Sequence, residues 1–462
     1  MFQRDILSKL EMWATKPKRK PLVLRGARQV GKTTLVDEFG KIFEIYIKLN
    51  LENPEHIQPF DNYTNMEVLL TGIYVTADVP RKDVPTLIFI DEIQNSPRAV
   101  MLLRYFYEEY PHLHVIAAGS LLETLIDSHI SFPVGRVEYL AVRPCSFCEF
   151  LTAMSKTELQ KVVKEMGVTN GIHSMTMDLF NTFTLIGGMP EIVAHFAANR
   201  DIVGLSEIYD TILTGYKDDV EKYAKNDTMK YVIRYILKEG WTYAAQQITL
   251  GGFAESAYKA REMGEAFRTL EKTMLLELVY PSTAALIPAP ADLKRAPKLI
   301  WNDTGLVNYA ANIQKEIFGA KDILDAYRGK IAEQIVAQEL ISQETRVSAT
   351  RGFWERKKYG SDAEVDFILQ KDSKIIPIEV KSGHNSKLKS LHLFMDECPH
   401  DWAVRVWSQP FSIDKAKTQA GKEFNLINLP FYYVGVLEKV LEKVMDKKYK
   451  IMNNGVRVEL KM

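Results

Sequence analysis

One short stretch constrains the fold of this chain more than any other. The apolar residues 22–24 lead into a glycine-flanked loop, and a helix-like segment over residues 34–39 follows it. Gly26 and the run from Gly31 to Thr33 fit the pattern G-x-x-x-x-G-K-[ST]. Such a loop wraps a phosphate with backbone N–H groups, so side chains must be absent where the backbone comes close. The stretch therefore predicts a phosphate-binding loop between a buried strand and a helix.

The residues at the end of this loop have distinct tasks in nucleotide binding. Lys32 is long enough to reach the β and γ phosphates, and the Thr33 hydroxyl can ligate Mg²⁺. The start of the following helix adds the positive end of its dipole. ATP and Mg²⁺ are therefore the expected cofactors, while a chance glycine loop before a surface lysine is the competing interpretation. The residues expected to bind the nucleotide are Gly26, Ala27, Arg28, Gln29, Val30, Gly31, Lys32, Thr33 and Thr34.

A second motif ends in two carboxylates. Residues 86–90 form a continuous apolar run, typical of a buried parallel strand, and Asp91 and Glu92 follow directly. Ligands of open α/β sheets bind at the carboxyl ends of such strands. With a phosphate-binding loop upstream, the run has the form of a Walker B strand, in which Asp91 holds the Mg²⁺ shell and Glu92 polarises the attacking water. An exposed strand end is the alternative.

Alternating strand and helix patterns extend this arrangement. Residues 114–120 give a further buried strand, and residues 135–144 read as a loop into a last strand. Strands that alternate with helices, with the phosphate-binding loop first, predict an α/β fold with a parallel, doubly wound sheet. Ser120, at the end of its strand, is placed to sense a γ-phosphate, and it fits a helix N-cap equally well.

Length and charge bound the remaining possibilities. At about 150 residues per domain, 462 residues predict roughly three domains. Basic and acidic residues number 59 each, so any nucleic-acid surface must be a local one. Three cysteines suit a reducing compartment, so a cytoplasmic protein is expected, with Cys145 and Cys148 as core residues. No apolar run approaches about 18 residues, so no membrane span is predicted.

Taken together, these motifs resemble a known family. The chain is similar to prokaryotic AAA-type ATPases whose C-terminal half carries a domain of unknown function related to restriction-endonuclease-like nucleases. The resemblance implies that Ser120 takes the first sensor position and that Arg136 is the best candidate for an arginine finger, with Arg143 second. An ordinary salt bridge is the alternative for Arg136. The segments that carry the resemblance are residues 26–33, 90–94, 118–120, 135–136, 146–150, 187–191, 303–306 and 364–383.

The middle of the chain predicts helices of two kinds. Residues 179–197 are expected to form lid helices on the nucleotide domain. Residues 256–274 have the pattern of an amphipathic helix with Arg261, Arg268 and Lys272 on one stripe. With a helix before it and a strand after it, and with the family resemblance, this segment predicts a winged helix-turn-helix whose basic stripe contacts DNA. The alternative is an interdomain scaffold with solvated basic side chains.

A cluster of carboxylates is expected near the C-terminus. Residues 364–369 and 375–381 read as two strands joined by a tight turn. Asp366 and Glu379 can therefore meet across a hairpin, and Lys381 shares the face of Glu379. Two carboxylates and a lysine are thus predicted on one side of the hairpin.

This set, with Glu333 from a preceding helix, matches the D…E-x-K arrangement of the endonuclease-like superfamily. The resemblance implies that Asp366 and Glu379 hold Mg²⁺ through oxygen atoms and that Lys381 orients the attacking water. An acidic hairpin with a surface salt bridge is the alternative. Pro377 in the second strand is unusual there, because proline prefers sheet edges.

These observations predict an α/β protein of three domains. We expect an AAA-type ATPase domain with lid helices over residues 1–200, a winged helix-turn-helix-like domain over 201–285, and an endonuclease-like α/β domain over 286–462. The expected function is Mg²⁺-dependent ATP binding and hydrolysis, coupled to DNA through the two later domains. The alternative is an ATP-dependent switch or protein-binding module whose nuclease-like domain is inactive. A third possibility is protein remodelling by a ring-shaped homo-oligomer in which Arg136 acts on a neighbouring subunit.

Overall fold

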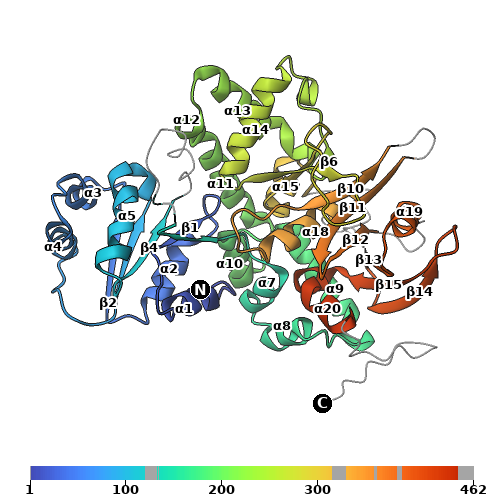
Figure 1. Ribbon diagram of the computed structural model, residues 1–462, viewed down its shortest axis with the longest axis horizontal. Coiled ribbons are helices and arrows are strands. Elements are labelled where there is room, and N and C mark those ends of the chain that lie inside the picture. Colours follow the sequence, from blue (N-terminus) through green and yellow to red (C-terminus); the bar gives the residue numbers. More distant parts are fainter. Residues whose placement is uncertain are drawn as a thin grey trace.

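The computed structural model describes residues 2–119, 133, 135–314, 329–357, 362–381 and 388–445. Three sheets lie within these residues. Figure 1 shows the N-terminal sheet in blue and cyan on the left and the C-terminal sheet in orange and red on the right, with green and yellow helices between and above them. Within the part of the chain so described, no helix is both long enough and apolar enough to span a membrane.

The N-terminal sheet is parallel throughout, as the alternating pattern predicted. Its strand order is β2-β3-β4-β1-β5, so β4 separates β1 from β3. Because all strands run the same way, the ends of β1 and β3 reach the same edge of the sheet. The strands are β1 (Leu22–Arg25), β2 (Ile45–Asn50), β3 (Thr86–Asp91), β4 (His114–Ala118) and β5 (Glu138–Ala141).

Both faces of this sheet are covered by apolar cores. Val23 and Ile88 belong to a core on one face, whereas Leu24 and Phe89 belong to a core on the other. Continuous apolar strands are required for this, because successive side chains point to opposite faces. The helices of this unit are α1 (Leu7–Ala14), α2 (Lys32–Gly40), α3 (Pro54–Asp61), α4 (Met66–Thr76), the 3₁₀ helix η1 (Ile93–Asn95) and α5 (Pro97–Glu109).

The helical body follows the N-terminal sheet. The predicted lid segment corresponds to α9 and α10, which are separated at Gly187 and Gly188, and Pro190 starts α10. Gly187 has a φ of 74°, and a Cβ atom on Gly188 would lie 2.2 Å from the Cys145 carbonyl oxygen, so both positions require glycine. The helices are α7 (Phe147–Ala153), α8 (Thr157–Lys164), α9 (Asn170–Ile186), α10 (Pro190–Asn199), η2 (Val203–Leu205), α11 (Ser206–Asp218), α12 (Val220–Tyr223), α13 (Asp227–Glu239), η3 (Gly240–Tyr243), η4 (Phe253–Glu255) and α14 (Ala260–Lys272).

A small sheet of order β6-β9-β7 adjoins α13 and α14. Its strands are antiparallel and comprise β6 (Gln246–Gln247), β7 (Leu276–Val279) and β9 (Lys298–Trp301). The expected boundary at 285/286 does not separate the sheets. β9 lies beyond that boundary but pairs with β7, and β8 (Pro281–Ser282) lies before it but pairs with the C-terminal sheet. Strand pairing joins distant segments, so a contiguous division of the sequence could not show it. The winged-helix assignment stays a prediction.

The C-terminal sheet is mixed, with strand order β14-β15-β13-β12-β11-β10-β8. The predicted hairpin is present as β11 and β12, which pair antiparallel. Contrary to the preference of proline for sheet edges, Pro377 lies in the interior strand β12, one residue before the pairing with β13 begins at Ile378. The strands are β8, β10 (Gly352–Arg356), β11 (Ala363–Lys371), β12 (Lys374–Val380), β13 (Trp402–Trp407), β14 (Ser412–Lys417) and β15 (Glu423–Pro430).

One continuous core joins the helical body to the C-terminal sheet. It contains Phe180 of α9, Trp301 of β9 and Ile378 of β12, all of them buried. The two later parts of the chain therefore pack as one body. The remaining helices are α15 (Thr304–Ala310), α18 (Lys330–Ser342), α19 (Lys389–Glu397), η5 (Phe431–Val436) and α20 (Leu437–Met445).

Candidate functional site

The glycine-rich loop connects β1 to α2, as the sequence predicted. Gly31 caps α2 with a φ of 87°, which favours glycine. Gly26 is required for a different reason, because a Cβ atom there would lie 2.2 Å from the carbonyl oxygen of Val142. The loop is therefore shaped by packing against the segment after β5 as well as by its own turn.

Lys32 begins α2 and lies buried inside the loop. Its Nζ atom donates hydrogen bonds of 2.9 Å to the carbonyl oxygens of Gly26 and Ala27. Burial lowers the pKa of Lys32 to about 8. These contacts hold the ammonium group at the centre of the loop, where a phosphate would compete for it.

Thr33 and Asp91 meet across the edge of the sheet. The Thr33 hydroxyl of α2 donates a 2.7 Å hydrogen bond to Asp91 Oδ2 at the end of β3, although β4 lies between β3 and β1, the strand that leads into the loop. Burial raises the pKa of Asp91. Hydroxyl and carboxylate oxygens are ligands that Mg²⁺ prefers, so this pair fits the metal that the loop implies.

Glu92 follows Asp91 and turns toward the same place. It adopts a left-handed backbone conformation with a φ of 51°, which is uncommon outside glycine and asparagine. Burial raises the pKa of its carboxyl group, and Gln94 donates a hydrogen bond to Glu92 Oε2. A carboxylate held in this way is suited to accept a proton from water.

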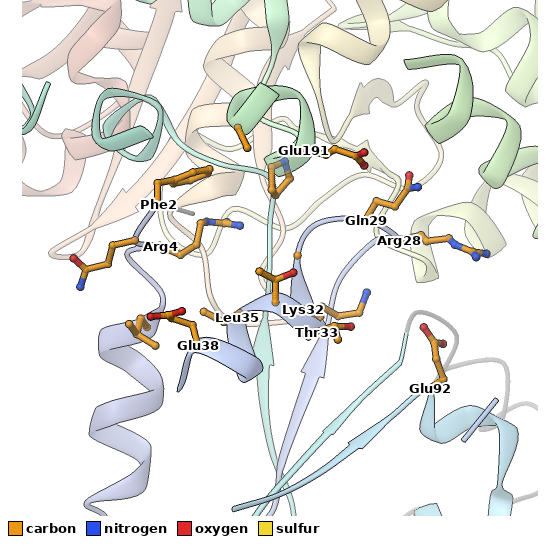
Figure 2. Close-up of a pocket in the computed structure, with 16 residues that line it drawn as sticks. Phe2, Arg4, Arg28, Gln29, Lys32, Thr33, Leu35, Glu38, Glu92 and Glu191 are labelled. Atoms are coloured by element: carbon orange, nitrogen blue, oxygen red, sulfur yellow. The ribbon is translucent and has the colours of Figure 1, made fainter. Parts of the chain in front are cut away.

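Lys32, Thr33 and Glu92 line a cavity of about 700 Å³. Figure 2 shows Arg28, Gln29, Lys32, Thr33 and Glu92 around it. Its volume falls within the range of small-molecule sites, about 300–1,000 Å³. The opposite wall is formed by the N-terminal segment, which sequence reasoning missed, and by the start of α10, which lies within the predicted lid segment. The residues of that wall are Phe2, Gln3, Arg4, Leu7, Pro190, Glu191 and Ala194.

Arg4 ties the N-terminal segment to the loop. Its Nε atom donates to Glu149 at 2.9 Å, and its terminal nitrogens donate to the carbonyl oxygens of Val30 and Arg143 at 3.2 and 2.8 Å. The side chains of Arg4 and Glu149 are 12% and 6% exposed, so this is a buried ion pair. No local sequence signal indicated Arg4, because Glu149 lies 145 residues away.

A second arginine connects the loop to the helical body. The Arg28 guanidinium forms an ion pair with Asp219, which follows α11 and is buried. The Tyr216 hydroxyl also donates to the Arg28 carbonyl oxygen at 3.3 Å. The nucleotide loop is therefore in direct contact with the middle of the chain.

The two arginine-finger candidates lie elsewhere in the single chain. Arg136 donates a 2.6 Å hydrogen bond to Glu108 of α5, and half of its side chain is exposed. Arg143 is half-buried near Arg351 and Glu277, and desolvation lowers its pKa to about 10. Neither guanidinium is among the described groups that line the cavity. Ser120, the sensor candidate, lies outside the described residues.

The structure brings the C-terminal site residues together. Asp366 Oδ2 accepts a 2.7 Å hydrogen bond from the Val380 N–H, and Lys381 forms a 2.7 Å ion pair with Glu379. Carboxylate oxygens of Glu333, Glu364 and Asp366 lie within 4.8 Å of one another. Burial, followed by the charge of Asp366, raises the pKa of both Glu333 and Glu379. Glu333, Glu364, Asp366 and Glu379 form an acidic centre, and Glu364 is the member for which no role was predicted from the sequence.

The acidic centre contains a lysine that sequence reasoning missed. Lys298 of β9 is 2% exposed, and its Nζ atom lies 3.0 Å from Glu333, 2.6 Å from Glu364 and 3.7 Å from Asp366. Although burial opposes it, the three carboxylates raise the pKa of Lys298. The lysine lies 35 residues or more from each partner in the sequence, and the strand that carries it belongs to another sheet.

Two further predictions concern single side chains. Cys145 and Cys148 are buried free thiols, as expected of core residues. On α14, Arg261 and Arg268 are exposed, while Lys272 is half-buried and its carbonyl oxygen accepts a hydrogen bond from Arg25. The basic stripe is thus a surface at its first two positions and an internal contact at its third.

Comparison with protein families identifies the N-terminal part. Residues 18–151 match the model of an AAA domain, whereas residues 177–317 and 328–432 match two models described only as domains of unknown function. Among curated proteins, none matches the sequence. The loop motif, the parallel sheet and the family match together support a P-loop ATPase of the AAA type that binds ATP.

Several solved structures are similar to the chain. A Walker-type ATPase of Pyrococcus abyssi has 13% identity over 67% of this chain and 96% of its own, with a TM-score of 0.40. The Orc1 protein of Aeropyrum pernix, solved in complex with DNA, has 11% identity over 68% and 93%, with a TM-score of 0.24. A signal-transduction ATPase of Pyrococcus horikoshii has 10% identity over 74% and 46%, with a TM-score of 0.28. Likenesses this weak indicate neither activity nor partner.

Proposed function

We propose that the protein hydrolyses ATP with Mg²⁺ in the cavity at the edge of the N-terminal sheet. The observation that carries this proposal is the convergence of Lys32, Thr33, Asp91 and Glu92, from two separate motifs, on that edge. A bare phosphate-binding loop would need only the first two. The added carboxylates supply a metal ligand and a base, which are the parts that hydrolysis requires.

Each residue then has one task. Lys32 exchanges its contacts with the loop carbonyls for the β and γ phosphates, and the N–H groups from Gly26 to Thr34 surround the phosphate chain. Thr33 and Asp91 hold Mg²⁺, which neutralises developing phosphate charge when it is bound. Glu92 accepts a proton from the attacking water, and its raised pKa makes it a stronger base than an exposed glutamate.

Two variants with different expected phenotypes test this assignment. Lys32→Ala should abolish ATP binding, measured by calorimetry, while Glu92→Gln should bind Mg²⁺-ATP normally and release no phosphate. Lys41→Ala is the matched control, because Lys41 is exposed beyond the end of α2 and pairs only with Glu38 among the described ion pairs. Hydrolysis by Lys32→Ala at the wild-type rate would overturn the proposal.

We further propose that hydrolysis acts on a complex with DNA through the later parts of the chain. The exposed Arg261 and Arg268 of α14 support a local DNA contact. Replacing both with alanine should weaken binding to duplex DNA and reduce the dependence of that binding on salt. Unchanged affinity and salt dependence would assign α14 to a scaffold role.

A second candidate function is an ATP-dependent switch whose nuclease-like part does not cut. The ion pairs of Lys298 with Glu333 and Glu364 favour it, because they occupy oxygens that a nuclease would use for metal. Assays of supercoiled and linear DNA with Mg²⁺ or Mn²⁺, with and without ATP, separate the two functions. Cutting that is lost in Asp366→Ala and Lys381→Ala would establish a nuclease, and its absence would favour the switch.

We also propose that Arg136 is an arginine finger that acts between subunits. Its guanidinium is half exposed, so it can act on the nucleotide of a neighbouring subunit. Sedimentation with and without ATP should then show a nucleotide-dependent homo-oligomer. A monomer under both conditions would remove the arginine-finger role and leave the surface contact with Glu108.

A further inference from the structure

The acidic centre is completed by a residue from another sheet. Lys298 belongs to β9, which pairs with β6 and β7, whereas Asp366 and Glu379 belong to the hairpin of the C-terminal sheet and Glu333 to α18. The side chain of Lys298 crosses from the first group of elements to the second. At 2% exposure, this side chain is almost completely removed from solvent.

The surroundings of the Lys298 ammonium group are those of a bound cation. Two carboxylates, from Glu333 and Glu364, lie at hydrogen-bond distance from Nζ, and Asp366 lies slightly farther away. Aromatic rings are placed beside it as well: the centroids of Phe353 and Phe367 lie 4.9 and 5.8 Å from Nζ. Ring faces and carboxylates both attract positive charge.

The other lysine of the centre does not compete for these oxygens. Lys381 is engaged with Glu379 Oε1, while Glu379 Oε2 is buried and has no hydrogen-bond partner among the described residues. The centre therefore holds four carboxylates and two lysines, and it retains an oxygen that could accept more positive charge. Without the Lys298 side chain, Glu333, Glu364 and Asp366 would present oxygens within 4.8 Å of one another, a spacing suited to one metal ion.

We propose that Lys298 is the resident cation of this acidic centre and that it excludes divalent metal ions from it. An ammonium group and a metal ion cannot both approach the same carboxylate oxygens, because each would occupy the space between them. Because β9 carries Lys298 into the acidic centre, its packing against the C-terminal sheet keeps the centre free of metal ions. This inference concerns a site distant from the ATP cavity and does not depend on the proposed hydrolysis.

Binding of Mn²⁺ by the full chain tests the proposal without an activity assay. Free Mn²⁺ is counted by its paramagnetic resonance signal in the absence of nucleotide, and Asp366→Asn isolates binding at the acidic centre from binding elsewhere. Wild type and Asp366→Asn should bind the same amount of Mn²⁺. Lys298→Met should bind one additional ion per chain, at least about tenfold more tightly than any wild-type binding at this centre, and Lys298→Met/Asp366→Asn should lose it.

Two outcomes would overturn the proposal. One is Asp366-dependent Mn²⁺ binding in the wild type with the affinity of Lys298→Met. The other is the absence of an additional site in folded Lys298→Met. Lys294→Met is the matched control, since it removes an exposed lysine four residues away and should leave Mn²⁺ binding unchanged.

Removal of a buried countercharge can prevent folding, so a second variant is needed. Lys298→Met/Glu364→Gln removes one positive and one negative charge together and keeps Glu333, Asp366 and Glu379 as ligands. It should also gain the Asp366-dependent ion, and Mn²⁺ should raise its melting temperature more than that of the wild type. Equal rises in the two proteins would count against exclusion by Lys298.

Discussion

The Thr33 hydroxyl of α2 donates a 2.7 Å hydrogen bond to the Asp91 carboxylate at the end of β3. This contact joins the two nucleotide motifs before any ligand is present. Thr33→Ala should therefore weaken the binding of Mg²⁺-ATP by about tenfold or more, because one metal ligand is lost and the Asp91 carboxylate loses the donor that positions it. Thr33→Ser keeps the hydroxyl and should bind normally. Calorimetry with and without Mg²⁺ provides the check, since binding of metal-free ATP should be equal in all three proteins.

Gly26 is the loop position with least room for a side chain. In Gly26→Ala the new Cβ atom would meet the Val142 carbonyl oxygen at 2.2 Å, so the loop must shift away from the segment after β5. We expect a loss of about 1–3 kcal/mol in the free energy of unfolding, together with weaker ATP binding. Chemical denaturation and calorimetry measure the two effects.

Gly215 provides the matched control for that substitution. It lies inside α11, and a Cβ atom there would have no neighbour within 4 Å. Gly215→Ala should leave ATP binding unchanged and stabilise the protein by about 0.5–1 kcal/mol, because alanine is the better helix former. If both variants behaved alike, the close approach at Gly26 would not be the cause.

Arg4 supports the loop from a position that no motif marks. Arg4→Met should destabilise the protein by about 3–5 kcal/mol, because it leaves the buried Glu149 carboxylate without its countercharge. It should also weaken ATP binding, since the Val30 carbonyl loses its donor. The double variant Arg4→Met/Glu149→Gln should recover part of the stability but none of the contact with Val30. Recovery of both properties would refute this separation.

The sequence predicted the features that contiguous residues form, and it missed contacts between residues that lie far apart in the chain. The loop from Gly26 to Thr34 and the strand end at Asp91 and Glu92 are contiguous patterns, and each predicted element is present. β1 and β3 are buried at every position, because both faces of their sheet are covered, so the parallel fold could be predicted from continuous apolar runs.

The features that the sequence did not indicate share a physical origin. Lys298 and Arg4 are held by partners far along the chain, and nothing in the residues beside them indicates a buried ion pair. The predicted boundary at 285/286 falls between β8, which pairs with β10, and β9, which pairs with β7, and such pairing does not follow from composition. Asp366 and Glu379 could be placed together from the sequence because they lie on one hairpin of adjacent strands. Lys298, which balances the charge of the centre, lies on a strand of another sheet.

His114 links the stability of the N-terminal sheet to pH. Its ring packs edge-on against Trp13 and Phe43, and Arg19 lies 3.3 Å from Nδ1. Burial, followed by the charge of Arg19, lowers the pKa of His114 from 6.5 to about 4. In the unfolded chain this histidine binds its proton more readily than in the fold. The neutral His114 ring therefore makes its full contribution to the stability of the folded protein above pH 6.5. This contribution is lost as the pH falls toward 4.

His114→Gln should remove part of this pH dependence, because glutamine carries no proton to gain on unfolding. The melting temperature of the wild type should fall between about pH 7 and about pH 5, and that of the variant should fall less. His112→Gln is the control, since His112 is exposed two residues away and should preserve the wild-type slope. Because burial also lowers the pKa of His173, His392 and His400, some dependence should survive in His114→Gln. Identical slopes in wild type and His114→Gln would show that the buried ring at the N-terminal sheet does not contribute to the acid sensitivity.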